Sequence, residues 1–244
     1  MRQPLFFLAT KWLTDCSLAM ENPFHSIRKQ YSRATLHESQ INPDPLKQVE
    51  GWLSDAMAAE CPEPTAMILS TVGNDARPSS RVVLMKGLDE RGISFFTNYD
   101  SRKGVQLTSN PYASLLFFWP DLERQVRIEG PVERVPKVES DIYFDSRPEQ
   151  SRLSAAVSPQ SKEIPSRQWL IEQIEKTEAQ SKLSIGPGFN RGLQEFSIKR
   201  PDNWGGYRLK PDYFEFWQGG EDRLHDRIIY IWEDSDWRIA RLAP

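Results

Sequence analysis

Apolar side chains recur every three or four residues in a segment that begins near position 45. The repeat consists of Leu46, Val49, Trp52, Leu53, Ala56 and Met57. Apolar residues at this spacing form one stripe along an α-helix, which packs against a core. Asp44 is a suitable N-cap, and Cys61-Pro-Glu-Pro64 ends the pattern because proline cannot continue helical hydrogen bonding. The sequence therefore predicts a helix that begins at Pro45 and ends before Cys61.

Short apolar or alternating runs, bounded by turn residues, occupy much of the remaining chain. The predicted strands are Ala66–Val72, Ser80–Met85, Ile93–Thr97, Ser114–Trp119, Gln125–Val135, Gly206–Leu209, Tyr213–Trp217, Ile228–Trp232 and Trp237–Leu242. Turn residues such as Gly73-Asn-Asp75 and Asn110-Pro111 separate them. The connectors among the first three strands are too short for a parallel crossover, so these strands are expected to pair in antiparallel fashion.

Four further segments have helical character, and one reads as a loop. The helices are predicted over Ser101–Ser109 with Ser101 as the cap, Lys137–Ser146, Ser151–Val157 and Ser166–Ser181. The glycine-containing stretch from Ile185 to Lys199 is predicted to be a loop. Many antiparallel strands with few helices indicate a mainly β (α+β) fold, in the form of a closed or nearly closed barrel.

The composition is that of an ordinary globular protein. Of the 244 residues, 39% are hydrophobic and 27% are charged, and the formal net charge is −3. A chain of this length can bury a substantial core. The slightly negative charge provides no general attraction for nucleic acid, so any anion site must be a local cluster of cations. We predict a single domain over residues 42–244, after a partly disordered extension over residues 1–41.

The cysteines and the N-terminus bear on the compartment in which the protein works. Cys16 and Cys61 have the spacing of neither a metal site nor a redox pair, which favours a reducing compartment and a cytoplasmic location. No apolar run is long enough to cross a membrane. The first fourteen residues contain Arg2 and Lys11 but no acid, a faint likeness to a mitochondrial transit peptide. The alternative, which the sequence favours, is a disordered extension.

Cations stand at the ends of two predicted elements. In Arg81-Val-Val-Leu-Met-Lys86 they bracket a strand, where they either serve a ligand or reach water. In Ser101-Arg102-Lys103 they stand at the start of a helix. Cations are unfavourable beside the positive end of the helix dipole unless an anion is bound there. The second segment, which follows the Phe95-Phe-Thr-Asn98 strand, therefore predicts a phosphate site.

Other polar residues could complete such a site. Tyr143 and Arg147 are four residues apart and share a helical face, and with Ser151 they offer a guanidinium and two hydroxyls to a second phosphate. Gln125 can both donate and accept hydrogen bonds at the edge of a heteroaromatic ring. Ser158-Pro-Gln-Ser161 adds a polar turn. Each of these features is also compatible with an ordinary protein surface.

The segment from Phe216 to Arg227 combines an indole, two guanidiniums and an imidazole with a Gly-Gly pair. In an extended strand, Arg223, His225 and Arg227 would point to one face and suit a planar anionic ligand. The alternative is a charged edge strand that resists aggregation. The three histidines are too scattered in sequence to suggest a metal site. The chain also lacks a phosphate-binding loop, a dinucleotide fingerprint and a Ser–His–Asp pattern.

Taken in order, these motifs resemble the pyridoxine (pyridoxamine) 5′-phosphate oxidase family. The resemblance runs from about Arg28 to Pro244, and it includes Asn203-Trp-Gly-Gly-Tyr207 and the terminal Arg241-Leu-Ala-Pro244. It implies an FMN-binding split β-barrel with peripheral helices, working as a homodimer that holds FMN between its subunits. The chain departs from the family pattern at Arg152-Leu-Ser154, at Lys162 and in the long loop around residues 185–200.

The resemblance also implies a set of site residues. Those matched to FMN are Arg81, Val82, Val83, Leu84, Met85, Lys86, Phe96, Thr97, Arg102, Lys103, Gln125, Gln160, Ser161, Trp217 and Arg227. Those matched to the substrate are Arg28, Tyr31, Lys86, Tyr143, Arg147, Ser151, Arg223, Leu224 and His225, with the segment at 28–31 closing the site. Arg223 and His225 are the expected catalytic residues. Arg223 would orient the ring, because a guanidinium stays protonated, and His225 would serve as hydrogen-bond partner or proton shuttle. No metal is expected.

The implied activity is oxidation of pyridoxamine or pyridoxine 5′-phosphate to pyridoxal 5′-phosphate. Hydride would pass from the C4′ carbon to the flavin, and O2 would then reoxidise the flavin and yield H2O2. Two alternatives stay open from the sequence. One is a split-barrel FMN reductase with a different substrate, and the other is a non-catalytic carrier of FMN or pyridoxal phosphate.

Overall fold

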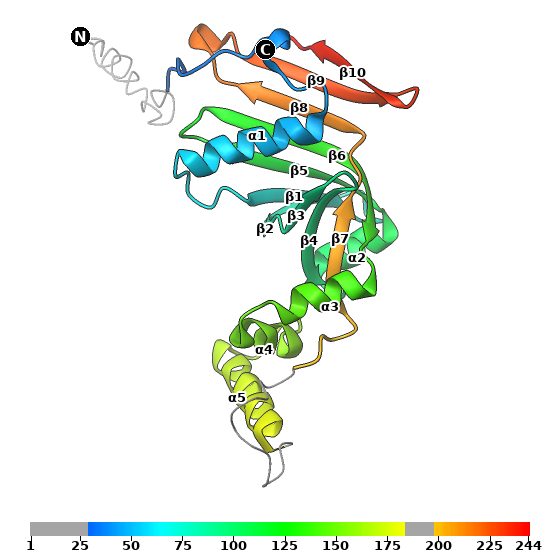
Figure 1. The fold of residues 1–244 in the computed structure, drawn as a ribbon. Coiled ribbons are helices and arrows are strands. Elements are labelled where there is room, and N and C mark those ends of the chain that lie inside the picture. Colours follow the sequence, from blue (N-terminus) through cyan, green and yellow to red (C-terminus); the bar gives the residue numbers. More distant parts are fainter. Residues whose placement is uncertain (1–28, 184–197) are drawn as a thin grey trace, which may run out of the picture.

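The computed structural model describes residues 29–183 and 198–244, except for the side chains of residues 181–183. Arg28 and nearly all of the predicted loop therefore lie outside the described residues. Within the described part, ten strands join in one antiparallel sheet (Figure 1). They are β1 (Ala66–Val72), β2 (Pro78–Leu84), β3 (Gly87–Asp89), β4 (Gly92–Asn98), β5 (Tyr112–Trp119), β6 (Arg124–Arg134), β7 (Trp204–Leu209), β8 (Tyr213–Gln218), β9 (Asp226–Glu233) and β10 (Asp236–Arg241).

The sheet branches at β6, and this branching makes it a split barrel. The main path runs β10-β9-β8-β6-β5-β1-β2, while β7 pairs with both β6 and β4, and β4 also pairs with β3. The first half of β6 pairs with β5 and β8, and Val132–Arg134 pairs with β7. Gly130 lies between these halves, where a Cβ atom would stand 2.0 Å from the carbonyl oxygen of Lys210. A side chain at Gly130 would therefore block the crossing of the two backbones.

The structure confirms the nine predicted strands, whose ends lie within two residues of the prediction and coincide with it at both ends of β1. It also contains β3, a three-residue strand too short to be signalled by alternation. The antiparallel pairing of β1 with β2 is confirmed, but the expectation that the next predicted strand continues this pairing is wrong. That strand, β4, pairs instead with the β3 hairpin arm and with β7, more than a hundred residues later in the chain.

Five α-helices and two short 3₁₀ segments are present in the described residues. They are α1 (Pro45–Ala58), α2 (Arg102–Ser109), α3 (Lys137–Asp145), α4 (Glu149–Val157), α5 (Arg167–Leu183), η1 (Glu38–Gln40) and η2 (Glu221–Arg223). The predicted caps are confirmed. Asp44 accepts hydrogen bonds from the first amides of α1, and the Ser101 hydroxyl accepts one from Gly104 in α2. Both caps satisfy amides that have no partner within the helix.

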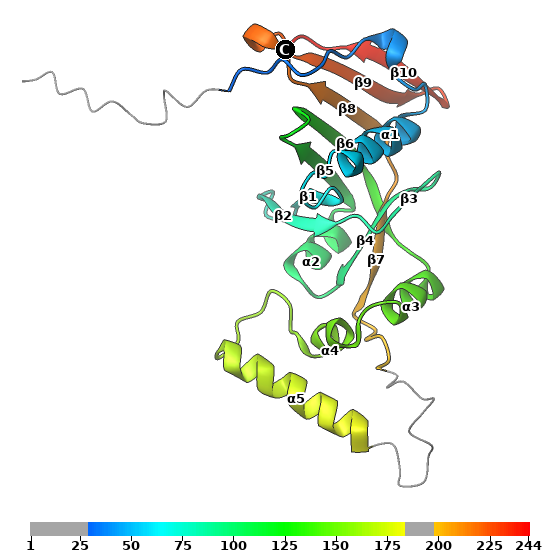
Figure 2. The ribbon, with the colours of Figure 1, turned by 60° about the vertical axis from the view of Figure 1, so that its left-hand side comes forward.

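Helix α1 covers one face of the sheet, and the remaining helices gather around the far end of β4 and β7 (Figures 1 and 2). The main core lies between α1 and the sheet, where Trp52 meets Phe216 edge to face at 5.2 Å. A smaller core contains Phe144, Leu153 and Trp204 and joins α3, α4 and β7. None of the helices in residues 29–183 and 198–244 has both the length and the apolar character needed to span a bilayer.

The other face of the sheet exposes several large apolar side chains. Ile68 and Val82 lie directly opposite each other on β1 and β2, and Leu84 and Phe118 lie on the same face. Their exposed fractions are 36% for Ile68, 64% for Val82, 41% for Leu84 and 50% for Phe118. We call these four residues the outer apolar patch. An apolar group of this kind on a sheet is typical of a surface that another protein covers.

Candidate active site

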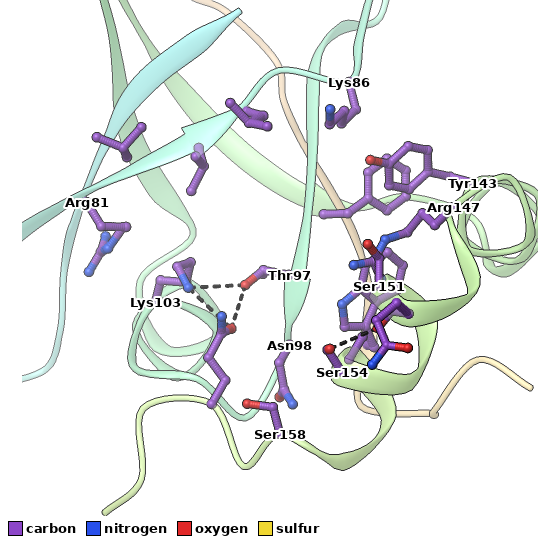
Figure 3. Close-up of a pocket in the computed structure, with 18 residues that line it drawn as sticks. Arg81, Lys86, Thr97, Asn98, Lys103, Tyr143, Arg147, Ser151, Ser154 and Ser158 are labelled. Atoms are coloured by element: carbon purple, nitrogen blue, oxygen red, sulfur yellow. Dashed lines mark hydrogen bonds between the residues drawn. The ribbon is translucent and has the colours of Figure 1, made fainter. Parts of the chain in front are cut away.

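A cavity of about 740 Å3 lies where β2, the end of β4 and the start of α2 face α3 and α4 (Figure 3). Its volume falls within the range of small-molecule sites, roughly 300–1,000 Å3. The residues that line it are Arg81, Val82, Val83, Leu84, Lys86, Phe96, Thr97, Asn98, Lys103, Tyr143, Arg147, Gln150, Ser151, Ser154, Ala155, Ser158, Gln160 and Trp204. Four of these lining residues are cations and none is an acid.

Arg81 and Lys103 form one cationic side of the cavity. Arg81 points from β2 and Lys103 from the first turn of α2, and Lys103 is only 9% exposed. Burial lowers the pKa of Lys103, and the nearby charge of Arg81 lowers it further. Burial also lowers the pKa of Arg81, together with the charge of Arg102 at the start of the same helix. Three cations thus repel one another here, an arrangement that an anionic ligand would relieve.

Neutral polar groups hold Lys103 in place. Its ammonium donates to the Thr97 hydroxyl at 3.2 Å and to the side-chain oxygen of Gln160 at 3.4 Å. The Thr97 hydroxyl itself donates to the same Gln160 oxygen at 3.1 Å (Figure 3). None of these partners is charged, so the positive charge of Lys103 remains available to a ligand.

The other side of the cavity is built on a stack of aromatic rings. Phe96 stacks on Tyr143 with ring centroids 4.0 Å apart, and Trp204 lies parallel to both. The Arg147 guanidinium lies 4.7 Å from the centre of the Trp204 ring, within the range of a cation–π interaction. Arg147 lies just after α3 and not on it, but it still reaches the same cavity as Tyr143 and Ser151.

Arg147 contains a buried polar atom without a partner. Its Nη1 atom is shielded from solvent and makes no hydrogen bond within the described residues. Burial lowers the pKa of Arg147, against a small opposing effect of Tyr143. A buried donor without an acceptor is costly and usually marks a place for a water, ion or ligand. An anion beside Lys86, Tyr143, Arg147 and Ser151 would satisfy it.

The two cationic sides fit a ligand set with two anionic groups. Arg81 and Lys103 lie on one side of Thr97, and Tyr143, Arg147 and Ser151 on the other (Figure 3). The rings and the apolar side chains of β2 line the space between them. The residues present therefore suit a flavin phosphate on one side and a phosphorylated substrate on the other. Among the described residues, no three His, Cys, Asp or Glu side chains gather closely enough to hold a metal ion.

Several of the expected site residues lie elsewhere, on β6, β8 and β9, on the turn before β9, and on the chain segment that packs against them. We call them the distal group: Tyr31, Gln125, Trp217, Arg223, Leu224, His225 and Arg227. Gln125, Trp217 and Arg227 occupy directly opposed positions on β6, β8 and β9, so their side chains share the face that includes the outer apolar patch. Three strands of the sheet separate β8 from β2. One chain therefore does not bring the distal group to the cavity.

The expected row of Arg223, His225 and Arg227 on an extended strand is wrong. Arg223 belongs to the η2 turn and has a positive φ of 65°, and β9 begins only at Asp226. The turn is tight, since a Cβ atom on Gly220 would stand 2.3 Å from the carbonyl oxygen of Leu224. Arg223 and Leu224 are consequently exposed on a projecting loop. His225 accepts a hydrogen bond at Nδ1 from the Gly220 amide, so its neutral form has the proton on Nε2.

Arg227 differs from the cavity cations because it is paired with an acid. Its Nε donates to the buried Glu215 carboxylate at 2.8 Å, and Nη1 donates to the Ala243 carbonyl. The hydrogen bond to Glu215 raises the pKa of Arg227. Arg127 donates to the other oxygen of the same carboxylate at 2.8 Å. A ligand reaching Arg227 would therefore meet a guanidinium whose position is already fixed.

A segment at the start of the described chain packs over the distal group. We call residues 29–36 the N-terminal strap. The Glu123 carboxylate accepts hydrogen bonds from the Ser32 and Arg33 amides, at 3.0 and 3.1 Å. Tyr31 then meets Trp217 edge to face at 5.6 Å and His225 at 5.7 Å. The strap thus places a phenol ring beside the imidazole.

Of the remaining expected residues, Met85 is buried in the main core, and Arg102 and Ser161 are exposed beside the cavity without lining it. Six lining residues were not predicted: Asn98, Gln150, Ser154, Ala155, Ser158 and Trp204. Ser158 and Trp204 stand inside motifs that the family resemblance had already singled out, so these motifs could have identified them. Asn98 closes the Phe95-Phe-Thr-Asn98 segment named before the phosphate site, and the other three have no local sequence signal.

The chain is similar in sequence to proteins of one known family. Residues 53–181 match the family model described as pyridoxamine 5′-phosphate oxidase, and residues 204–244 match the pyridoxine 5′-phosphate oxidase C-terminal dimerisation region. A pyridoxine/pyridoxamine 5′-phosphate oxidase from Acidovorax sp. (strain JS42) is 53% identical over 220 residues, covering 89% of this chain and 94% of the relative. One from Polaromonas sp. (strain JS666 / ATCC BAA-500) is 52% identical over 229 residues, covering 92% of this chain and 100% of the relative.

Solved structures show the same fold. PhzG from Burkholderia lata 383, in complex with tetrahydrophenazine-1-carboxylic acid, superposes with a TM-score of 0.76 at 31% identity, over 87% of this chain and 100% of that one. A pyridoxamine 5′-phosphate oxidase-related, FMN binding protein from Nostoc punctiforme PCC 73102 superposes with a TM-score of 0.63 at 16% identity, over 82% of this chain and 98% of that one.

Proposed function

This chain belongs to the pyridoxamine 5′-phosphate oxidase family, and we propose that it oxidises pyridoxamine 5′-phosphate and pyridoxine 5′-phosphate to pyridoxal 5′-phosphate. The enzyme is an oxidoreductase that uses FMN as its cofactor and O2 as the final electron acceptor, releasing H2O2. One observation supports this function above all others. A single cavity presents two groups of cations, one on each side of an aromatic and apolar wall, without an acid among its lining residues.

The first cationic side is assigned to the FMN phosphate. Arg81 and Lys103 line the cavity and Arg102 stands beside them at the start of α2. The lowered pKa values of Arg81 and Lys103 reflect cations that are buried without an acid. A phosphate would supply the missing negative charge, and the free amides at the helix start add to its binding. Thr97 and Gln160 would contact the flavin beyond the phosphate.

The second cationic side is assigned to the phosphate of the vitamin B6 substrate. Arg147 offers the unpartnered Nη1 atom, and Lys86, Tyr143 and Ser151 line the same side. Since the Arg147 guanidinium already packs against the Trp204 ring, Arg147 would bind the phosphate with little loss of side-chain conformational entropy. The pyridine ring would then lie between this side and the flavin, over the apolar residues of β2.

The site is completed by a second copy of the chain. The C-terminal match is to a dimerisation region, and it contains β8, β9 and all distal residues after position 204. Val82 and Leu84 belong both to the outer apolar patch and to the cavity lining, so a partner that covers the patch also covers the cavity. In a two-fold symmetric dimer the same contact occurs twice. We therefore assign the distal group of each protomer to the cavity of the other.

FMN supplies the chemistry of accepting a hydride from the C4′ carbon and passing the electrons to O2. The residues of the chain bind the cofactor and the substrate, orient the substrate ring, and exclude water from the site. Arg223 cannot act as a base, because its guanidinium stays protonated, so its role is to orient the ring and the C4′ substituent. Since Nδ1 of His225 accepts the hydrogen bond from the Gly220 amide, Nε2 is the ring nitrogen that would donate or relay a proton. The N-terminal strap, through Tyr31, would close the site over the substrate.

The proposal is tested with the purified protein. We expect a yellow protein with the absorption spectrum of bound flavin, which releases H2O2 when supplied with either pyridoxamine 5′-phosphate or pyridoxine 5′-phosphate. A non-catalytic carrier would be yellow without releasing peroxide. A protein that oxidises tetrahydrophenazine-1-carboxylic acid, the compound bound in the PhzG structure, but neither B6 phosphate would overturn the substrate assignment.

A further inference from the structure

Within the part of the chain that the structure describes, Arg81 donates only to neutral acceptors. Its Nη1 atom donates to the Leu69 carbonyl at 3.1 Å and to the Thr71 hydroxyl at 2.6 Å. Its Nη2 atom donates to the Ser79 hydroxyl at 2.7 Å and to the side-chain oxygen of Gln106 at 3.3 Å. The guanidinium is thus oriented by four contacts, none of which removes its charge.

Gln106 is the common point of this network. It lies on the inner face of α2 and is 7% exposed. Its side-chain oxygen accepts hydrogen bonds from Thr71 at 2.7 Å, Ser79 at 2.9 Å and Arg81 at 3.3 Å. All three donors converge on one amide oxygen, so Gln106 determines where the hydroxyls stand as well as the guanidinium. It does not itself line the cavity.

The chain contains a direct contrast to this arrangement. Arg227 is held by the buried carboxylate of Glu215, which raises the pKa of Arg227. Arg81 is held by the amide of Gln106, and burial together with Arg102 lowers its pKa. Glutamine and glutamate have the same shape, but only glutamate neutralises a guanidinium. The amide at position 106 therefore orients Arg81 and leaves its charge free for an external anion.

We propose that Gln106 is a positioning residue that gives this protein its preference for a flavin with a 5′-phosphate over one without. The inference rests on the proposed function, because it requires that Arg81 binds the phosphate of FMN. Gln106 acts through Arg81 and touches neither the cofactor nor the substrate. The feature recognised is the negative charge of the phosphate. Riboflavin has the same ring as FMN but lacks this charge because it has no phosphate.

The test compares the dissociation constants of FMN and riboflavin, measured on the apoprotein by quenching of flavin fluorescence. In Gln106→Glu we expect the affinity for FMN to fall about tenfold to a hundredfold, because the charge-assisted bonds to the phosphate are lost. The affinity for riboflavin should stay within about twofold of wild type. The matched control is Gln48→Glu, which makes the same change at a buried glutamine in α1. Within the described residues, the side-chain oxygen of Gln48 accepts a hydrogen bond only from the Asn42 amide.

A second measurement separates this role from a structural one. The melting temperature of the Gln106→Glu apoprotein should equal or exceed that of wild type, because the new carboxylate pairs with Arg81. If this variant fails to fold, Gln106→Met takes its place, with an expected loss of FMN affinity of about threefold to tenfold and no change for riboflavin. A loss of equal size for both flavins would overturn the inference.

Failure of the inference and failure of the proposed function give different results. If wild type prefers FMN and Gln106→Glu keeps that preference, the role of Gln106 is wrong and the FMN site stands. If wild type itself binds riboflavin as tightly as FMN, the phosphate site at Arg81 is wrong, and the inference falls with it.

Discussion

Individual residues in the cavity are arranged for binding at the cost of stability. Arg81, Lys103 and Arg147 are partly or wholly buried with no acid beside them in residues 29–180 and 198–244, and burial lowers the pKa of each. A cation removed from water without a counter-charge destabilises the folded protein. Such an arrangement persists where a ligand provides the counter-charge. Each of these residues can therefore be tested twice, through ligand affinity and through the stability of the ligand-free protein.

The first prediction concerns Arg147. Replacing it by alanine removes charge-assisted hydrogen bonds worth about 1.5–3 kcal/mol each, so KM for pyridoxamine 5′-phosphate should rise roughly tenfold to a hundredfold. Steady-state peroxide release at saturating FMN measures it. The affinity for FMN should not change. Unphosphorylated pyridoxamine serves as the control substrate. An equal rise in KM for that substrate would show that Arg147 does not bind the phosphate.

The second prediction concerns the pH dependence of Lys103. Its pKa in the folded apoprotein is lowered by burial and by Arg81. Between this lowered value and the ordinary lysine value, the unfolded chain binds more protons than the folded one, so the stability of the folded apoprotein rises with pH in that interval. Lys103→Met removes the buried charge. The variant should therefore be more stable than wild type at neutral pH, with a difference that shrinks as the pH rises into the alkaline range.

Thermal unfolding of the two apoproteins across that pH range measures the difference. Lys137→Met, a change at an exposed lysine on α3, controls for the loss of one positive charge. If the difference in melting temperature between wild type and Lys103→Met stayed constant with pH, Lys103 would not carry a destabilising buried charge. With FMN bound the sign should reverse, since Lys103 then has a phosphate beside it and its removal weakens the complex.

Among the elements, the N-terminal strap depends on single side chains of distant segments. Glu123 has a positive φ of 55° and is buried in the turn between β5 and β6, where its carboxylate receives two strap amides and the Lys29 ammonium. Burial raises the pKa of this carboxyl, but these hydrogen bonds bring it below its ordinary value. Asp226 and Arg241 bind the strap further along. These contacts hold Tyr31 against His225.

The third prediction follows from the Glu123 contacts. Glu123→Gln keeps the size of the side chain but replaces a charged acceptor with a neutral one, which weakens its two hydrogen bonds by about 1 kcal/mol. The Ser32 and Arg33 amides should then exchange hydrogen about fivefold faster, as measured by amide exchange. The Leu36 amide, which donates to Asp226, is the internal control for a local effect. Unchanged exchange at Ser32 and Arg33 would remove Glu123 as the anchor of the strap.

At the scale of the whole molecule, the proposed site is divided between distant parts of the sheet. The cavity lies beside β2 and α4, whereas the distal group extends over β6, β8, β9, the η2 turn and the N-terminal strap, with at least β1 and β5 between its strands and β2 (Figure 1). The exposed patch of Ile68, Val82, Leu84 and Phe118 lies on the face that connects them. A dimer formed through this face would join a cavity from one protomer to a distal group from the other.

The fourth prediction tests that division by complementation. Arg147→Ala damages the cavity, and Arg223→Ala damages the distal group, so each homodimer should be nearly inactive at low substrate concentration. After the two variants are unfolded together and refolded, half of the dimers are mixed and each mixed dimer has one intact site of two. The mixture should recover about a quarter of the wild-type activity. No recovery, with mixed dimers verified by mass spectrometry of the native complex, would place both residues in the same protomer's site.

The sequence by itself determined the elements and the local chemistry of this protein. Helical spacing, caps and turn residues act over a few neighbours, so α1, α2 and nine of the strands follow from them, as do the cation pairs at Arg81–Lys86 and Arg102–Lys103. The motif order from about Arg28 to Pro244 was enough to indicate the family and its fold.

Only the tertiary structure decided which distant segments meet. Three contacts join residues far apart in the chain: the pairing of β4 with β7, the packing of Arg147 on Trp204, and the hydrogen bond from Arg81 to Gln106. No local propensity encodes them. The same holds for Arg223. The alternating pattern predicted a strand there, but Arg223 lies in a turn in which the backbone of Gly220 closely approaches that of Leu224. Strand pairing and side-chain packing are set by burial of the shared core, so partners of this kind become visible only once the chain is folded.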